Sequence, residues 1–112
     1  MSNPPTVFII DDDPAVRDAI GLLLRAGGLS VDTFASAAEF LAAAAARQPG
    51  CVVLDVRMPG MSGLDLQKQL QTQGYRIPII FITGHGDVPM AIRAMKAGAF
   101  DFIEKPFQGE TL

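Results

Sequence analysis

The chain has 112 residues and a mass of 11.9 kDa, which fits a single domain and excludes a two-domain catalytic protein or a long repeat array. Apolar residues make up 49% of the chain and the mean hydropathy is +0.29, so there is enough material for a core and intrinsic disorder is excluded. Nine basic and twelve acidic residues give a net charge of −3, which excludes unaided binding to a nucleic-acid backbone.

The first half of the chain alternates between strand and helix signals. The apolar run Val7–Ile10 is a predicted strand. Asp13–Pro14 then predicts an N-cap and first helical residue, and Gly27–Gly28 predicts the end of that helix. Leu29–Phe34 alternates apolar and polar residues, which predicts a strand with one face in water.

The second half repeats the same alternation. Cys51–Leu54, Ile77–Ile82 and Ala99–Ile103 are predicted strands, and their nearly continuous apolar character is typical of parallel strands covered on both faces. Asp87 and Gly98 bound a predicted fourth helix. Capping boxes start the second and third helices, Ser36 with Glu39 and Ser62 with Asp65.

Five strand-then-helix repeats predict an α/β domain with a parallel sheet, right-handed crossovers and helices on both faces. The last helix would start near Phe107, which leaves six residues for it. We therefore expect this helix to be truncated and the chain to be part of a longer protein.

Targeting and compartment signals are few. The single Cys51 cannot form an internal disulfide, which favours a reducing compartment. The opening Met1–Pro5 has no charged segment followed by an apolar one, and no uncharged apolar run approaches the roughly 20 residues of a membrane span. We expect a cytoplasmic domain with no membrane partner.

Polar residues follow four of the predicted strands: Asp11 and Asp12, Asp55, Thr83 and Lys105. Because the carboxyl ends of parallel strands meet at one edge of a sheet, these side chains are expected to form one acidic pocket. Oxygen ligands without His or Cys favour Mg²⁺, or Mn²⁺, and three carboxylates, a divalent cation and one lysine together carry no net charge. A carboxylate beside such a cation can attack phosphorus, so the sequence predicts phosphoryl capture on an aspartate.

The predicted fourth helix carries a candidate partner surface. On a helical wheel, one face is expected to meet the sheet: Val88, Ala91, Ile92 and Met95. Met90 then points outward, flanked by Ala94 and Ala97. An outward methionine among alanines is a candidate site for a protein partner.

The motifs in their order along the chain resemble the response-regulator receiver domain. They are the acidic pair Asp11–Asp12, the stretch Leu54–Pro59, Thr83 and Lys105–Pro106. The stretches Thr83–Met90 and Asp101–Phe107 resemble the FixJ-type subfamily closely. The resemblance spans essentially the whole chain, 1–112, and implies a flavodoxin-like, doubly wound five-stranded sheet of order 2-1-3-4-5.

The resemblance also implies roles for individual residues. Asp55 would be the phosphoacceptor, Asp12, Asp55 and the Arg57 backbone carbonyl would bind Mg²⁺ directly, and Asp11 would act through water. Lys105 would contact the phosphoryl group and precede Pro106 in a cis peptide bond. Thr83 and Phe102 would form a switch, although Phe102 lacks the hydroxyl of the tyrosine found in many relatives.

The function implied by the resemblance is signal transfer. A histidine kinase would donate the phosphoryl group, and the modified domain would form a homodimer through the fourth helix and the fifth strand. Relatives usually carry a C-terminal helix-turn-helix domain that binds DNA, which would be absent from this chain. The domain would assist its own phosphorylation and dephosphorylation without being an enzyme that turns over a metabolite.

Two other interpretations remain open at the level of sequence. A haloacid-dehalogenase-like phosphatase also places an aspartate nucleophile and Mg²⁺ after its first strand, in a pattern that Asp11 and Asp13 formally satisfy. Against it, Pro14 assigns Asp13 to the helix start and the chain is short for that fold. A pseudo-receiver that only binds partners, without phosphorylation, is the other alternative.

Overall fold

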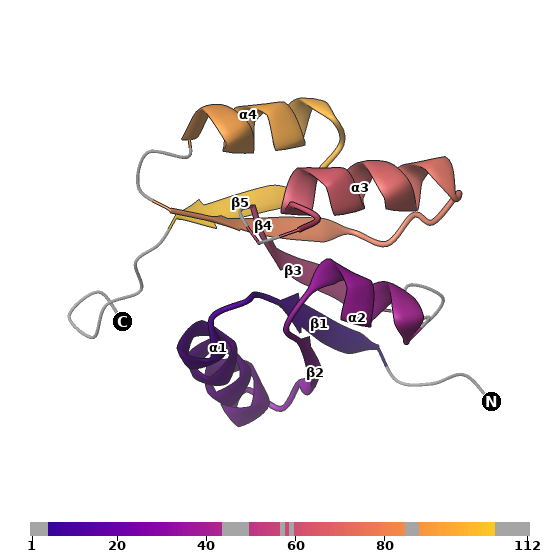
Figure 1. Ribbon diagram of the computed structural model, residues 1–112. Coiled ribbons are helices and arrows are strands. Elements are labelled where there is room, and N and C mark those ends of the chain that lie inside the picture. The colour runs from indigo at the N-terminus through magenta and orange to yellow at the C-terminus, as the bar shows by residue number, and fades with distance from the viewer. Residues whose placement is uncertain (1–4, 44–49, 57, 59, 85–87, 105–112) are drawn as a thin grey trace.

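The computed structural model describes residues 5–43, 50–56, 58, 60–84 and 88–104. Strands and helices alternate through these residues (Figure 1). The elements in chain order are β1 (Thr6–Ile10), α1 (Pro14–Ala26), β2 (Ser30–Phe34), α2 (Ala37–Ala42), β3 (Gly50–Asp55), α3 (Gly63–Thr72), β4 (Ile79–Thr83), α4 (Val88–Lys96) and β5 (Asp101–Glu104).

The five strands form one parallel sheet of order β2-β1-β3-β4-β5, as expected. Helix α1 lies on one face of the sheet, and α2, α3 and α4 lie on the other (Figure 1). The fold class is therefore confirmed as α/β with helices on both faces. The truncated helix predicted from Phe107 lies outside the described residues.

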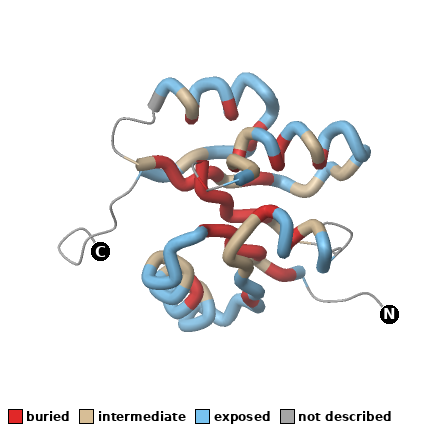
Figure 2. Tube along the Cα trace, viewed as in Figure 1, coloured by how far each residue is buried: buried red, intermediate tan, exposed pale blue. Residues whose placement is uncertain are grey.

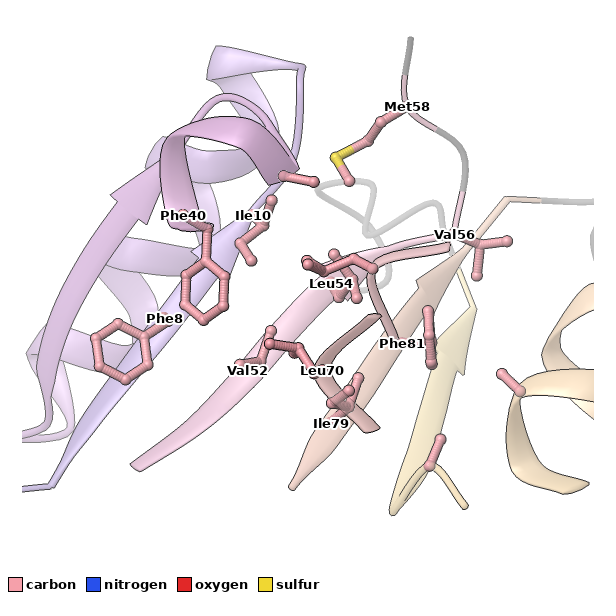
Figure 3. Packing of buried hydrophobic residues seen from close by; sticks show 14 residues of the cluster. Phe8, Ile10, Phe40, Val52, Leu54, Val56, Met58, Leu70, Ile79 and Phe81 are labelled. Atoms are coloured by element: carbon pink, nitrogen blue, oxygen red, sulfur yellow. The ribbon is translucent and has the colours of Figure 1, made fainter. Parts of the chain in front are cut away.

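The buried residues lie mainly along the strands of the sheet and at separate positions on the helices, as the red segments of the tube in Figure 2 show. The larger cluster lies between the sheet and α2, α3 and α4, and its strand residues include Phe8, Leu54 and Phe81 (Figure 3). The rings of Phe8, Phe34 and Phe40 pack against one another. Phe40 contacts the other two rings edge-on, Phe8 and Phe34 are tilted to each other, and the Phe34 and Phe40 centroids are 5.5 Å apart. A smaller cluster on the opposite face joins Ile9, Val31, Val53 and Ile82 to the partly buried Ile20 and Leu24 of α1.

Helix starts follow the predicted capping residues. The Asp13 side chain accepts a hydrogen bond from the Ala15 N–H at 2.9 Å, and Pro14 is the first residue of α1. Ser62 and Asp65 form a complete capping box at the start of α3. At α2 the Ser36 hydroxyl accepts from Glu39 N–H, but the Glu39 carboxylate reaches Ala35 N–H instead of the cap residue. The starts of these helices are thus set by local hydrogen bonds that the sequence reveals.

Helix α4 is rotated relative to the wheel-based prediction, and the prediction of an outward Met90 and Ala94 is wrong. Ala94 is fully buried, and Met90 packs partly buried against the larger core cluster. Ile92 and Met95, predicted to face the sheet, are 47% and 37% exposed instead. Ala91 and Ala94 face inward, where small side chains let the helix lie close to the sheet. Met90 packs beside them, whereas Ile92 and Met95 stay outside.

Among the α4 side chains that the structure describes, Ala91 is the one member of the predicted inward face that is buried. Of the predicted outward face, Ala97 alone is exposed in the described part of the chain.

Within the described ranges, no helix has both the length and the apolar character that crossing a bilayer requires.

Candidate functional site

Parallel pairing places the predicted acidic residues together. Ile10 of β1 is paired with Leu54 of β3. Asp11, directly after β1, therefore lies beside Asp55, the last residue of β3, at the same edge of the sheet. Ligand oxygens of Asp11, Asp12 and Asp55 all lie within 4.8 Å of one another. The prediction that these three residues converge at one end of the sheet is therefore met by the structure.

The charges in this triad favour a cation. Asp11 and Asp55 are buried, with exposed fractions of 0% and 6%, whereas Asp12 is exposed. At this separation two carboxylates repel by about 3 kcal/mol at an effective dielectric constant of about 20. An all-carboxylate ligand set with one member in contact with solvent fits a hard divalent ion such as Mg²⁺, which keeps several waters when bound.

The loop between β1 and α1 holds Asp11 in place. The Asp11 Oδ1 accepts a hydrogen bond from the Asp13 N–H at 2.9 Å, and the Asp11 backbone carbonyl accepts one from Arg17 Nη1 at 2.6 Å. Asp13 itself caps α1, so it is committed to the helix and is not a second member of an Asp-x-Asp nucleophile pair. Sequence reasoning missed Arg17. A cation near the start of a helix is repelled by the positive end of the helix dipole, so an arginine at this place indicates that the side chain has a specific partner.

Thr83 ends β4 with its side chain fully buried. Its Oγ1 has no hydrogen-bond partner among the described residues. A buried hydroxyl of this kind costs free energy until a partner arrives, so it is prepared to bond an oxygen brought into the site. The neighbouring switch candidate, Phe102 of β5, is partly buried against the larger core cluster.

Gly63 sets the distance between α3 and Asp55. It is the first residue of α3, and its N–H donates a hydrogen bond to the Val56 carbonyl at 3.0 Å. A Cβ placed here would collide with the backbone carbonyl oxygen of Asp55 and approach the Phe81 ring at 3.0 Å. Sequence reasoning missed Gly63, although a poor helix former directly after an N-cap serine signals a close backbone approach.

We expect Gly63→Ala to lower the free energy of unfolding by about 1–3 kcal/mol, because the new methyl group must displace the Asp55 backbone. The displacement should also move the Asp55 carboxylate, so any affinity of the three aspartates for Mg²⁺ is expected to fall together with stability. Urea denaturation with and without Mg²⁺ measures both effects.

Gly21→Ala is the matched control. Gly21 lies inside α1, where a Cβ would meet nothing closer than Arg25 Nη1 at 3.5 Å. Alanine is the better helix former, so this variant should gain about 0.5–1 kcal/mol in stability. Equal destabilisation of both variants would contradict the packing of α3 on Asp55.

Cys51 takes no part in this site. It lies near the start of β3, partly buried, and burial raises the pKa of its thiol above the ordinary value. The neutral thiol is therefore the dominant form at neutral pH, which fits a small packing residue.

Three residues with predicted roles lie outside the described residues. They are Arg57 with its backbone carbonyl ligand, and Lys105 and Pro106 with their cis peptide bond. Their roles remain predictions from the sequence.

Comparisons with known proteins agree with this geometry. A sequence profile of the family described as "Response regulator receiver domain" matches residues 7–112. The response regulator protein TodT of Pseudomonas putida is 57% identical over 106 residues, which cover 95% of this chain and 47% of TodT. The transcriptional regulatory protein FixJ of Azorhizobium caulinodans is 54% identical over 101 residues, covering 90% of this chain and 48% of FixJ.

Solved structures give the same assignment. The crystal structure of FixJ-N superimposes with a TM-score of 0.86 at 49% identity and covers 96% of this chain and 86% of that one. The structure of response regulator StyR gives a TM-score of 0.87 at 54% identity, over 96% of this chain and 55% of that one. The chain spans about half the length of the curated relatives that it matches. With a profile match over nearly its whole length and relatives of this similarity, the chain belongs to the response regulator receiver domain family, and it resembles the FixJ-type members.

Proposed function

We propose that this domain accepts a phosphoryl group on Asp55 from a sensor histidine kinase, in a reaction that requires Mg²⁺ or Mn²⁺. The observation that carries the proposal is the convergence of Asp11, Asp12 and Asp55 at the sheet edge where β4 ends in the buried hydroxyl of Thr83. Family membership supports phosphoryl acceptance as the general activity.

The proposed step is a displacement at phosphorus. One Asp55 carboxylate oxygen forms a bond to phosphorus while the bond from phosphorus to the donor histidine nitrogen breaks, which leaves an acyl phosphate and a free imidazole. Asp12, Asp55 and the Arg57 carbonyl would hold the cation directly and Asp11 through water; the cation would offset negative charge on the phosphoryl oxygens. Thr83 would donate its hydroxyl to one of those oxygens, and Lys105 would pair with another.

The captured group would act as a switch. Once the Thr83 hydroxyl bonds a phosphoryl oxygen, its side chain turns toward Asp55 and vacates space next to β5. Phe102, already partly buried, would then move further inward. This two-state change would shift the population toward an active form without any turnover of a metabolite.

The active form is proposed to be a homodimer that uses α4 and β5. The outer side of α4 exposes Ile92 and Met95, which are three residues apart and therefore share one helix face. Exposed basic residues of α4, Arg93 and Lys96, and exposed acidic residues of β5, Asp101 and Glu104, give this surface both signs of charge. A two-fold copy can therefore pair basic α4 with acidic β5 in both directions.

We expect Ile92→Asp to weaken the phosphorylation-induced dimer at least about tenfold, because it places a carboxylate at the apolar centre of the interface. Labelling of Asp55 should be unchanged. Sedimentation of the domain before and after phosphorylation measures the dimer constant.

Leu22→Asp is the control for this substitution. Leu22 lies on α1, on the other face of the sheet, and is 72% exposed. The same change of charge and polarity there should leave the dimer intact. Equal weakening by both variants would remove the α4–β5 surface from the proposal.

The output is proposed to be transcription control in the cytoplasm, through a DNA-binding domain on the C-terminal side of the receiver domain. Support comes from the length of the relatives and from the name of one of them, a transcriptional regulatory protein. The receiver domain itself would contact DNA only through that additional part.

The decisive test is intact mass after incubation with acetyl phosphate and Mg²⁺, followed by mapping of the added group. One phosphoryl group on Asp55 that disappears when Mg²⁺ is chelated supports the proposal. No added mass would identify a pseudo-receiver, and a group mapped to Asp11 would favour the phosphatase-like alternative.

A further inference from the structure

Two glutamine side chains of α3 hold the end of α4. Gln67 Nε2 donates a hydrogen bond to the Ala94 carbonyl at 3.1 Å, and Gln71 Nε2 donates one to the Ala97 carbonyl at 2.5 Å. The two glutamines are four residues apart and therefore lie on the same face of α3. We call this pair of contacts the glutamine clasp.

The buried position of Gln67 makes the clasp more than a surface contact. Its side chain is 2% exposed, between the core residues Leu66 and Leu70. A primary amide buried among apolar groups costs free energy unless it is hydrogen-bonded, and an apolar residue of the same length would fill the space without that cost. The hydrogen bond to the Ala94 carbonyl therefore explains why a glutamine, and not an apolar residue, occupies position 67.

The clasp acts on a helix end that is already fixed by its own backbone. The Gly98 N–H donates to the Met95 carbonyl and the Ala99 N–H to the Ala94 carbonyl, around Gly98 with φ of 111°. These bonds form a Schellman ending, which leaves the Ala97 carbonyl without a helical partner. Gln71 satisfies that carbonyl, and Gln67 adds a second bond to the Ala94 carbonyl.

The opposite end of α3 lies against the phosphoacceptor. Gly63 contacts the backbone of Asp55 so closely that no side chain fits between them. Helix α3 thus reaches from the backbone of Asp55 to the C-terminal turn of α4. This connection is separate from the one through Thr83 and Phe102.

We propose that Gln67 and Gln71 are positioning residues that fix the C-terminal end of α4 to α3, so that α4 pivots about this end when Asp55 is phosphorylated. The inference rests on the proposed function, since a pivot needs the phosphoryl group that moves the helix. It assigns the larger displacement to the first turns of α4 and the smaller one to the turn that ends at Gly98.

The test compares Gln67→Met and Gln71→Met with the parent by backbone amide exchange and by NMR of alanine methyl groups. Both are done with and without Mg²⁺ and beryllofluoride as the phosphoryl mimic. Without beryllofluoride, the Gly98 and Ala99 amides should exchange about tenfold faster in Gln67→Met, while those of β1 and β3 are unchanged. In the parent, beryllofluoride should shift the Ala91 methyl signal more than the Ala97 signal, and in the variants the two shifts should become equal.

Gln69→Met is the matched control, because Gln69 is on the same helix but only partly buried and makes no side-chain hydrogen bond to α4 among the described contacts. It should behave like the parent. Gln71→Met alters an exposed side chain, so it keeps the test informative if the Gln67 variant does not fold. All variants should bind Mg²⁺ as the parent does, because the clasp does not touch the triad.

The outcomes separate the two proposals. If the parent responds to beryllofluoride and the Gln67 and Gln71 variants show the same amide exchange and methyl shifts as the parent and the Gln69 variant, the pivot alone is overturned. A parent that does not respond at all overturns the proposed function and the pivot with it.

Discussion

The Asp55→Asn variant is expected to lose phosphoryl labelling completely while its fold is retained. An amide has no anionic oxygen to attack phosphorus, so no acyl phosphate can form at this position. The substitution also removes one of three carboxylates whose oxygens lie within 4.8 Å of one another, which relieves repulsion in the metal-free domain. We therefore expect the free energy of unfolding without Mg²⁺ to be equal to or above that of the parent, by urea denaturation.

Asp13→Asn is the matched control for this experiment. It makes the same chemical change in the adjacent loop, and asparagine caps a helix about as well as aspartate, so α1 should be preserved. Labelling at the parent level is expected, by intact mass after acetyl phosphate and Mg²⁺. Retained labelling of Asp55→Asn, with the group mapped to Asp11, would contradict the assignment of the phosphoacceptor.

The Asp12→Ala variant is expected to lose both Mg²⁺ binding and phosphorylation. Asp12 is the exposed member of the triad and would meet the cation directly. In the parent, Mg²⁺ at a hundred times its dissociation constant should stabilise the fold by about 2.7 kcal/mol. The variant should gain almost nothing, which thermal unfolding with Mg²⁺ and with a chelator measures.

Asp32→Ala supplies the comparison for Asp12→Ala. Asp32 is an exposed aspartate on β2 and does not belong to the triad, so its loss removes the same charge without removing a ligand. It should retain the full stabilisation by Mg²⁺. Normal labelling of Asp12→Ala would refute its assignment as a metal ligand.

The part of the site that the sequence predicts is the part set by strand ends. Asp11 and Asp55 could be placed together because each follows a continuous apolar run, and parallel strands bring such ends to one edge. Thr83 follows from the same rule. Asp13 could be separated from its neighbours because Pro14 marks it as a helix cap, which the hydrogen bond to Ala15 N–H bears out.

The face of α4 could not be predicted in the same way. Arg93 and Lys96 mark the solvent side of this helix, and the two buried alanines lie roughly opposite them. The wheel-based prediction instead followed the large apolar residues Ile92 and Met95, and it therefore placed the inward face on the wrong side. Ala91 and Ala94 are buried because they permit close approach, and Ile92 and Met95 remain outside. Exposure of large apolar residues is common at protein surfaces, so their presence alone did not identify the core side.

Contacts between distant residues were also beyond the sequence. Gln67 binds the carbonyl of a residue 27 positions later, and Gly63 matters because of the backbone of Asp55. Neither partner leaves a mark in the local pattern of apolar and polar residues. Such positions become visible only when the helices are placed on the sheet.

The pairing of β1 with β3 would also restrict when the domain can first take up the proposed phosphoryl group. Its two central aspartates are brought together by strands that are distant in sequence, and Thr83 joins them only when β4 is in place. Non-local pairing of this kind forms late in folding, after the intervening chain has closed its loops. A nascent polypeptide whose fourth strand has not left the ribosome would lack this acceptor geometry. The proposed phosphorylation would then be restricted to copies whose sheet has assembled.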